Sequence, residues 1–383
     1  MDEIALLEGL LKIYSPTGQE AEAVDYLVAQ MRLAGFEAFV DEAGNAVGVL
    51  GSGPEHVLPH GGTTRSEAEG LVLSEAEGPV MLLGHIDTVP GFIPVHREGD
   101  RLSGRGAVDA KGPLACFVAA AGRAAGEHAG SPQQRRPLIV VGAVGEEGDS
   151  RGARYLIDKH RPAFTIIGEP SGWEKITLGY KGSAWFEYRV KRTLAHTSAR
   201  QESACEAAVG FWNRVTAWAG EQNTGAQKVF EQVSPTLREM TSDSDGFVES
   251  ARLGFGVRLP PGLSVEALEA ALRSLLAGTS TSHMAGAELT RLDGVNAYRG
   301  EKSTPLVRAF LMAIRKAGGA PGFTIKSGTS DMNLVAPAWG TPILAYGPGD
   351  SSLDHTPEEN ILISEYQQAI TVLTEVLNLL TSA

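Results

Sequence analysis

The sequence predicts an α/β protein in which a mostly parallel sheet forms the main domain and a smaller α+β domain is inserted into it. Short apolar runs at 79–83, 138–144 and 164–168 are separated by helix-like stretches, and a fourth run lies at 342–346. Strands that alternate with helices are typical of a parallel sheet covered on both faces. Between residues 176 and 292 the pattern changes to a β-α-β-β-α-β order, which is typical of an α+β unit.

The length of 383 residues is enough for two domains, each with its own core. We expect the main domain to comprise residues 1–175 and 293–383, and the inserted domain to comprise residues 176–292. Inside the main domain, the Gly-rich stretch 56–79 contains the sequence SEAEG twice. This stretch offers no apolar face to bury, so we expect an exposed insertion between two strands.

An amphipathic helix is expected to begin after Thr17. Thr17 and Glu20 have the T-x-x-E spacing of a capping box, in which each side chain bonds to the backbone of the other residue. Apolar residues then recur at helical spacing until Gly35 ends the pattern. These residues are Val24, Leu27, Val28 and Met31. We expect this helix to pack on the sheet.

The composition argues against several classes of partner. Acidic residues outnumber basic ones by 46 to 33, which gives a formal net charge of −13. No stretch interleaves Lys and Arg with aromatic residues, so we expect no nucleic-acid partner. No apolar run approaches the roughly 18 residues of a membrane span, and the first residues are acidic, unlike those of a secretory signal. We therefore expect a cytoplasmic protein that does not enter a membrane.

Histidine or acidic residues follow each of the apolar runs. Ligands of open α/β sheets bind beyond the carboxyl ends of the strands. The first run is followed by His85 and, two residues later, Asp87. The second run is followed by the adjacent pair Glu146 and Glu147, and the third by Glu169. Imidazole and carboxylate groups are therefore expected at one edge of the sheet, with Asp87 behind His85 to fix its tautomer.

Two loops add further candidates. Asp109 lies in the Gly-rich sequence GRGAVDAKG before a helix-like stretch, and His355 follows the fourth apolar run in the sequence DHTPEE. Carboxylate oxygens and imidazoles without thiolates suit Zn²⁺, Co²⁺ or Mn²⁺. Two metal ions that share one Asp would each have one His and one Glu besides, which leaves one glutamate unassigned.

Five sequences together resemble the dinuclear zinc amidohydrolases and peptidases of family M20: GHIDTVPG, GRGAVDAKG, GEEGDS, GEPSG and DHTPEE. The similarity spans essentially the whole chain in the right order. It implies that His85, Asp109 and Glu169 hold one metal ion, and that Asp109, Glu147 and His355 hold the other. It further implies that Glu146 is the general base and that Asp87 orients His85. The main domain would be the catalytic zinc-peptidase domain, and residues 176–292 the lid and dimerisation domain.

Within that family, LGYKG, RLPPG and SGTSDMN are similar to hydrolases that release lysine, or ornithine, from an amino-group carrier protein. The resemblance implies that the bond cleaved joins the γ-carboxyl of the carrier's C-terminal glutamate to the α-amino group of the amino acid. It also implies a homodimer in which His196 stabilises the oxyanion in the partner subunit.

The substrate-binding candidates come from two segments. Arg258 can clamp an α-carboxylate because its planar fork suits bidentate binding, although a structural salt bridge would also explain it. The second segment comprises Ser327, Gly328, Thr329, Ser330 and Asp331. Asp331 could recognise a side-chain ammonium, but turn chemistry alone would also explain this segment.

The sequence disfavours some other functions and leaves others open. A serine hydrolase is disfavoured because no G-x-S-x-G sequence occurs, and neither a P-loop nor a dinucleotide-binding fingerprint is present. Acetylornithine deacetylase, succinyl-diaminopimelate desuccinylase and dipeptidase activities stay open, since they share the metal-binding residues. A metal-binding scaffold without catalysis is a remote alternative, because the five implied metal ligands and the implied general base are all present.

Overall fold

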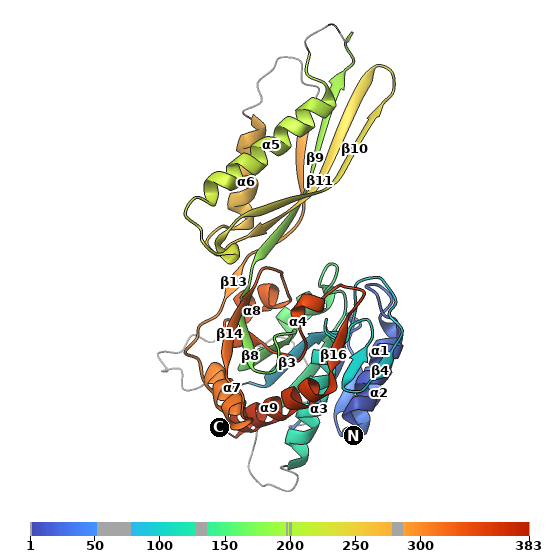
Figure 1. Cartoon of the computed structure of the whole chain (residues 1–383), viewed down its shortest axis with the longest axis vertical. Helices are drawn as coiled ribbons and strands as arrows, with labels where there is room; N and C mark the ends of the chain where they lie inside the picture. Colours follow the sequence, from blue (N-terminus) through green and yellow to red (C-terminus); the bar gives the residue numbers. More distant parts are fainter. Residues whose placement is uncertain are drawn as a thin grey trace, which may run out of the picture. The chain divides into compact units, whose positions relative to one another are not determined.

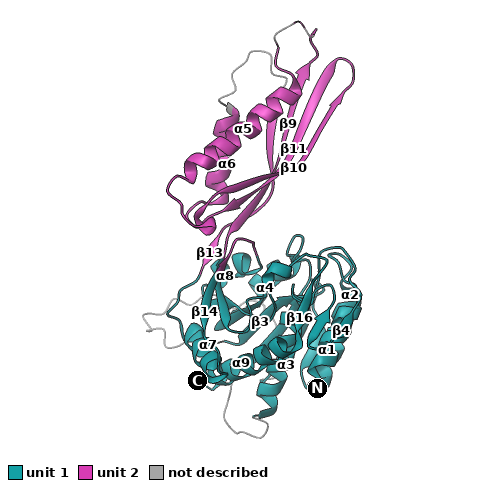
Figure 2. Ribbon diagram, viewed as in Figure 1, with its two compact units in different colours: residues 1–179, 300–324, 330–383 teal, residues 180–299, 325–329 magenta. Residues whose placement is uncertain are grey.

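The computed structural model describes residues 2–51, 78–127, 136–196, 198, 201–277 and 286–382. Most of the expected insertion at 56–79, including both SEAEG sequences, lies outside the described residues. The chain forms two compact units (Figure 2). Unit 1 comprises residues 1–179, 300–324 and 330–383, and unit 2 comprises residues 180–299 and 325–329.

The unit boundaries differ from the expected domain limits of 176 and 292. Residues 176–179 belong to unit 1 because they lie in β8 (Lys175–Tyr180), which pairs with the main sheet. Residues 293–299 belong to unit 2, where strand β12 (Ala287–Val295) pairs with its neighbour as far as Val295. The short segment 325–329 also belongs to unit 2, and no change of pattern in the sequence marks it.

The main sheet of unit 1 runs in the order β1-β2-β6-β3-β7-β15-β8, and β14 (Gly322–Lys326) also pairs with β8 (Figure 1). The four apolar runs form adjacent parallel strands of this sheet. These are β6 (Leu138–Ala143), β3 (Val80–His85), β7 (Phe164–Gly168) and β15 (Ile343–Ala345). The flanking strands β1 (Glu37–Val40), β2 (Ala46–Leu50) and β8 are antiparallel. The expected mostly parallel α/β core is thus confirmed.

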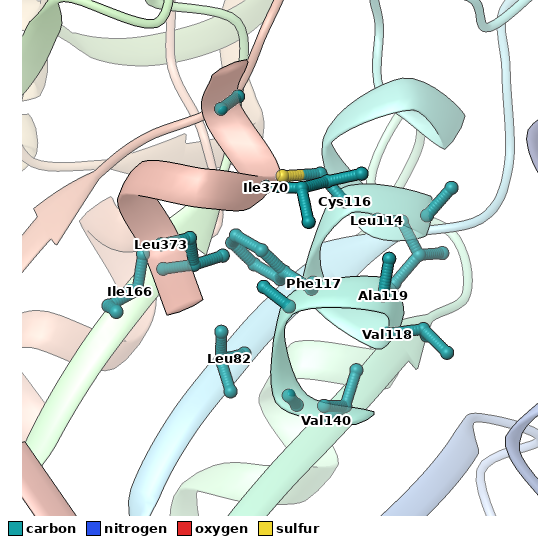
Figure 3. Packing of buried hydrophobic residues seen from close by; sticks show 14 of the residues in the cluster. Leu82, Leu114, Cys116, Phe117, Val118, Ala119, Val140, Ile166, Ile370 and Leu373 are labelled. Atoms are coloured by element: carbon teal, nitrogen blue, oxygen red, sulfur yellow. The ribbon is translucent and has the colours of Figure 1, made fainter. Parts of the chain in front are cut away.

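Both faces of this sheet are buried. Val80 and Leu82 lie in one large apolar cluster, and the alternating residues Met81 and Leu83 on the other face are equally buried. The cluster includes residues of α1 (Glu3–Lys12), α2 (Ala21–Leu33), α3 (Lys111–Glu127), α7 (Pro305–Lys316) and α9 (Ile363–Thr381). Phe117 of α3 lies inside it, between the strands and α9 (Figure 3). Helices α4 (Arg151–Lys159) and α8 (Met332–Trp339) pack on each other.

The amphipathic helix expected after Thr17 forms, but the expected capping box does not. Helix α2 begins at Ala21, and Glu20 bonds to the backbone N–H of Gly18 at 2.9 Å. The hydroxyl of Thr17 donates to a carboxylate oxygen of Asp87 at 2.7 Å instead of accepting from the helix. A long-range partner has therefore replaced the local bond that the T-x-x-E spacing predicts.

Unit 2 has the expected β-α-β-β-α-β order. Its antiparallel sheet runs β10-β11-β9-β12, built from β9 (Gly182–Thr193), β10 (Ser234–Ser244), β11 (Val248–Leu259) and β12. Helices α5 (Ala204–Gln222) and α6 (Val265–Ala277) cover one face, and β13 (Tyr298–Arg299) follows. The ring of Tyr188 stacks on that of Phe211 at 4.3 Å between centroids. This unit has an aromatic core of its own.

A three-stranded sheet completes unit 1. It runs in the order β16-β5-β4, with β4 (His96–Glu98), β5 (Arg101–Ser103) and β16 (Asn360–Leu362) all antiparallel. No helix in the described part of the chain is long and apolar enough to span a membrane.

Candidate metal centre

Three adjacent strands deliver acidic and imidazole side chains to one edge of the main sheet. His85 is the last residue of β3, Glu146 and Glu147 lie in the turn after β6, and Glu169 directly follows β7. Because β6, β3 and β7 are neighbours and parallel, their carboxyl ends meet. The side chains that the sequence places after separate strands are therefore close together.

Two loops complete the group. Asp109 lies between β5 and α3, and the peptide bond between Asp109 and Ala110 is cis. His355 follows the short helix η3 (Ser351–Leu353), with a φ of 63°. A non-glycine residue in this left-handed region is uncommon and is often found at functional sites.

Asp109 lies between the two histidines. Its Oδ1 is 3.1 Å from Nε2 of His85, and its Oδ2 is 3.1 Å from Nε2 of His355. His355 Nε2 is also 3.0 Å from Oε1 of Glu147, and His85 Nε2 is 3.9 Å from Oε1 of Glu169. The sets His85–Asp109–Glu169 and Asp109–Glu147–His355 each bring one ligand atom per residue within 4.8 Å of the others.

The hydrogen bonds of His85 show that this group suits a cation. Its Nδ1 lies 3.0 Å from the backbone carbonyl of Asp87, which can only accept, so Nδ1 donates. In the neutral ring, Nε2 then directs a lone pair at the carboxylate of Asp109. Two acceptors in contact require a proton or a cation between them. A set of carboxylate oxygens and imidazole nitrogens is the donor set of Zn²⁺, Co²⁺ or Mn²⁺.

The charges of the group are strongly coupled. Burial raises the pKa of Asp109, but its hydrogen bonds to His355 and His85 lower it more, so the net pKa is well below the usual range. The hydrogen bonds to Asp109 and Glu147 raise the pKa of His355 to about 10. Without metal, the histidines therefore hold protons where metal ions would supply the positive charge.

Glu146 has different surroundings from Glu147. Burial raises the pKa of Glu146 well above its usual range; the charge of His85 opposes this shift, while Asp331 and Glu169 add to it. Its Oε2 is 4.0 Å from Nε2 of His85. Burial likewise raises the pKa of Asp331 to about 6, and Oδ1 of Asp331 makes no hydrogen bond within the described residues.

Asp87 holds the two glutamates more directly than it holds His85. Its carboxylate accepts the backbone N–H of Glu146 at 3.0 Å and that of Glu147 at 3.1 Å. Oδ1 of this carboxylate is 3.6 Å from Nδ1 of His85, longer than a hydrogen bond. The backbone carbonyl of Asp87, and not its side chain, thus makes the short contact to His85. The hydrogen bond from Thr17 completes the set around this buried carboxylate.

The substrate-binding candidates fall into different environments. Arg258 of β11 donates from Nη1 to the hydroxyl of Thr329 at 3.0 Å, so these two residues of unit 2 are together. Ser327 is exposed and Gly328 half-buried. Ser330 is buried, and its hydroxyl accepts the N–H of Met332 at 3.3 Å, where α8 begins.

Lys181 is a further candidate for substrate binding, and its only signal in the sequence is its place in LGYKG. It is buried in unit 2, and its Nζ donates to the carbonyl oxygens of Val229 and Gln232. Burial lowers its pKa to about 8, and the charge of Arg258 adds to this effect. Lys181 and Arg258 thus form a basic pair inside unit 2.

His196 is exposed in unit 2 and its tautomer is defined by one bond. The backbone N–H of Ser198 donates to Nδ1 of His196 at 3.2 Å. In the neutral ring the proton then lies on Nε2, which makes that nitrogen a hydrogen-bond donor.

Comparisons with known proteins identify the family of this chain. Residues 81–379 match peptidase family M20/M25/M40, and the chain belongs to this family of metal-dependent hydrolases. Among individual relatives, the LysW-lysine hydrolase of Deinococcus radiodurans is 42% identical over 377 residues, which cover 97% of this chain and 95% of that protein.

Solved structures share the fold at lower identity. An M20 family metallo-carboxypeptidase from Sulfolobus solfataricus superposes with a TM-score of 0.73 at 18% identity. A tripeptidase from Staphylococcus aureus superposes with a TM-score of 0.74 at 17% identity. Each comparison covers 99% of both chains. The expected family and fold are thus confirmed.

Proposed function

We propose that this protein releases L-lysine from an amino-group carrier protein similar to LysW, as a step of lysine biosynthesis. L-ornithine, and with it arginine biosynthesis, is the second candidate product. The bond cleaved joins the γ-carboxyl of the carrier's C-terminal glutamate to the α-amino group of the product. The observation that carries this proposal is the 42% identity, over nearly the full length of both chains, with the LysW-lysine hydrolase of Deinococcus radiodurans.

Two Zn²⁺ ions are the proposed cofactors, with Co²⁺ or Mn²⁺ as alternatives. His85, Asp109 and Glu169 would hold one ion, and Asp109, Glu147 and His355 the other. The support is geometric, since these two sets coincide with two of the groups whose ligand atoms lie within 4.8 Å. The shared Asp109 already presents one oxygen to each histidine.

Glu146 is the proposed general base. When bound, the two ions would acidify a water molecule and polarise the amide carbonyl. The carboxylate of Glu146 accepts the proton of that water and later transfers it to the leaving α-amine. The position of Glu146 supports this role, because it belongs to neither of the two proposed ligand sets and its Oε2 lies 4.0 Å from Nε2 of His85. Asp87 fixes the backbone from which Glu146 extends.

Substrate recognition is assigned to two kinds of group. Arg258, with Lys181 and Thr329 beside it, would bind the carboxylate of the released amino acid. Asp331 would bind an ammonium group, since one of its buried oxygens makes no hydrogen bond within the described residues. Ser327 and Gly328 would contribute to substrate binding from the loop that precedes Asp331, and Ser330 would position Asp331.

The active form is proposed to be a homodimer formed through residues 176–292. His196 would then donate from Nε2 to the oxyanion in the partner subunit. The donor tautomer set by Ser198 supports this assignment, and so does the exposure of the ring.

A competition assay tests the substrate. The purified protein is loaded with Zn²⁺ or Co²⁺ and offered carrier-linked lysine, carrier-linked ornithine, N-acetylornithine and N-succinyl-diaminopimelate, and kcat/KM is measured for each. We expect a carrier-linked substrate to be preferred by at least about 100-fold, a discrimination of about 2.7 kcal/mol. Preferential turnover of N-acetylornithine or of the succinylated compound would overturn the carrier assignment and leave the metal centre intact.

A further inference from the structure

A buried ion pair lies next to the candidate ligands. Nη1 of Arg105 donates to Oε2 of Glu359 at 2.8 Å, and their side chains are 9% and 1% exposed. Neither residue belongs to any of the candidate metal-binding groups. Glu359 lies four residues after His355, and Arg105 lies four residues before Asp109.

Both oxygens of Glu359 bind the turn that leads to Asp109. Oε1 accepts the backbone N–H of Val108 at 2.9 Å and that of Asp109 at 3.1 Å. Oε2 accepts the N–H of Gly106 at 3.1 Å besides the guanidinium of Arg105. One carboxylate thus accepts four hydrogen bonds, and one of the donors is the backbone of the candidate bridging residue itself.

Arg105 extends the same network to two other segments. Its Nε donates to the carbonyl of Gly91 at 2.9 Å, in the segment that follows His85 and Asp87. Its Nη1 donates to the carbonyl of Thr356 at 3.2 Å, next to His355. The ion pair therefore connects the three segments that carry His85, Asp109 and His355.

Stability alone does not account for this arrangement. A buried ion pair contributes little net stability, because the desolvation of its two charges offsets their attraction. Here three of the four hydrogen bonds that the carboxylate of Glu359 accepts come from backbone N–H groups of the Gly-rich turn that leads to Asp109. We infer that Glu359 is a positioning residue, which fixes Asp109 relative to His355 at the spacing that two metal ions require. This inference rests on the proposed metal centre.

The test variant is Glu359→Gln, and Glu358→Gln is its matched control. A glutamine keeps the shape, but its NH₂ group must face one pair of the four donors, so two hydrogen bonds are lost in either orientation. Glu358 is the adjacent residue, is exposed and changes by the same charge. Any general effect of removing one negative charge near the centre should appear in both variants.

The measurements are made on the full-length protein without substrate. Zn²⁺ affinity is obtained by competition with a chromophoric chelator, and the geometry is followed by the visible absorption spectrum of the Co²⁺-loaded protein. We expect Glu359→Gln to lower the affinity of at least one site by about 10- to 100-fold and to change the Co²⁺ spectrum. Glu358→Gln should match the unaltered protein in both measurements.

Each outcome decides the inference. Equal metal affinity and an unchanged spectrum in Glu359→Gln overturn it, while the metal centre stands. Failure of the unaltered protein to bind two ions overturns the metal centre and this inference together. If circular dichroism shows that Glu359→Gln does not fold, Arg105→Lys decides, since a lysine cannot reach all three acceptors of Arg105. Weaker metal binding by Arg105→Lys supports the inference, and unchanged binding overturns it.

Discussion

Glu146 and Glu147 are neighbours in the chain but have separate environments. Oε1 of Glu147 is 3.0 Å from Nε2 of His355, whereas Oε2 of Glu146 is 4.0 Å from Nε2 of His85, and burial raises the pKa of Glu146. Both backbone N–H groups are held by Asp87. The two residues can therefore have different roles, with Glu147 bound to a metal ion and Glu146 free to accept a proton.

Replacing Glu146 by Gln should abolish turnover and leave both metal ions bound. The amide cannot accept the proton of a water molecule, and loss of a general base costs about 100- to 10,000-fold in kcat. The measurements are steady-state kinetics and metal content by atomic emission.

Glu147→Gln is the control for this prediction, because it should lower metal content as well as activity. Retained activity in Glu146→Gln would contradict the role of Glu146 as the base. Loss of metal in that variant would instead place Glu146 among the ligands.

The stability of the metal-free protein should fall as the pH rises from about 6.5 to about 10. The folded protein raises the pKa of His355 from 6.5 to about 10 through Asp109 and Glu147. A raised pKa stabilises the fold fully below the unfolded value, and this contribution is lost as the pH rises through the folded value. Urea unfolding across this range measures the effect.

Metal-loaded protein should show a flatter pH profile, because the ions replace these protons. His355→Gln should flatten the metal-free profile in the same way. A pH-independent stability in the unaltered metal-free protein would contradict the coupling between His355 and its two carboxylates.

Most residues of the candidate centre could be predicted from the sequence, but the hydrogen bonds that hold them in place could not. His85, Glu147 and Glu169 follow apolar runs. The carboxyl ends of neighbouring parallel strands meet at one edge of a sheet, so these side chains are expected to lie close together. The bond from Thr17 to Asp87 and the bonds of Glu359 join positions that are 70 and about 250 residues apart, and no local pattern encodes such pairs. For the same reason the T-x-x-E spacing predicted a capping box at Thr17 that does not form.

At the scale of elements, the turn after β6 determines where the two glutamates lie. Gly145 has a φ of 79°, which directs the chain out of the strand. A Cβ atom at Gly145 would lie 3.0 Å from Nη1 of Arg151 and 3.0 Å from a carboxylate oxygen of Asp149. The alternation of side chains along the strand ends here, so consecutive glutamates can approach one centre from the same turn.

Gly145→Ala should therefore destabilise the protein and weaken its centre. An alanine in the left-handed region costs about 1–2 kcal/mol, and the crowding near Arg151 adds to this. Urea unfolding gives the stability, and Zn²⁺ titration gives the affinity. Gly126→Ala is the control, since no atom of the described residues outside the backbone of α3 lies within 4 Å of a Cβ added at this helical glycine, and the alanine should raise the stability. Equal stability of Gly145→Ala and the unaltered protein would contradict the strain at this turn.

At the scale of the whole molecule, the fold class followed from the sequence because the buried parallel strands are continuous apolar runs. The limits of unit 2 did not follow as closely. Residues 176–179 look like part of the inserted domain but complete β8, and residues 325–329 join unit 2 through contacts that are remote in sequence. Membership of a unit depends on such contacts, and not on local pattern.

The proposed dimer predicts that two inactive variants restore activity together. Glu146→Gln lacks the base, and His196→Ala should lower kcat by about 100- to 1,000-fold by removal of an oxyanion donor. A mixed dimer contains one centre with Glu146 intact and His196 supplied by the other subunit. Random mixing of equal amounts should then recover about one quarter of the activity of the unaltered protein.

The control is a mixture of Glu146→Gln with Glu147→Gln. Each mixed dimer then has a defect in both centres, and no activity should return. Absence of recovery in the first mixture, with mixed dimers demonstrated by native mass spectrometry, would show that His196 does not act on the partner subunit.

The spacing of the strands sets the scale of the candidate centre. Neighbouring strands lie about 4.8 Å apart, close to the separation of about 3.5–4 Å between the ions of a two-metal site. His85, Glu147 and Glu169 extend from the ends of three consecutive strands, so hydrogen bonds of the sheet fix their separation. Loops that carry none of the candidate ligands or their supporting residues can change in sequence without altering this distance, and so can unit 2. Evolution can therefore replace the surfaces that select a substrate while the reaction distances stay constant.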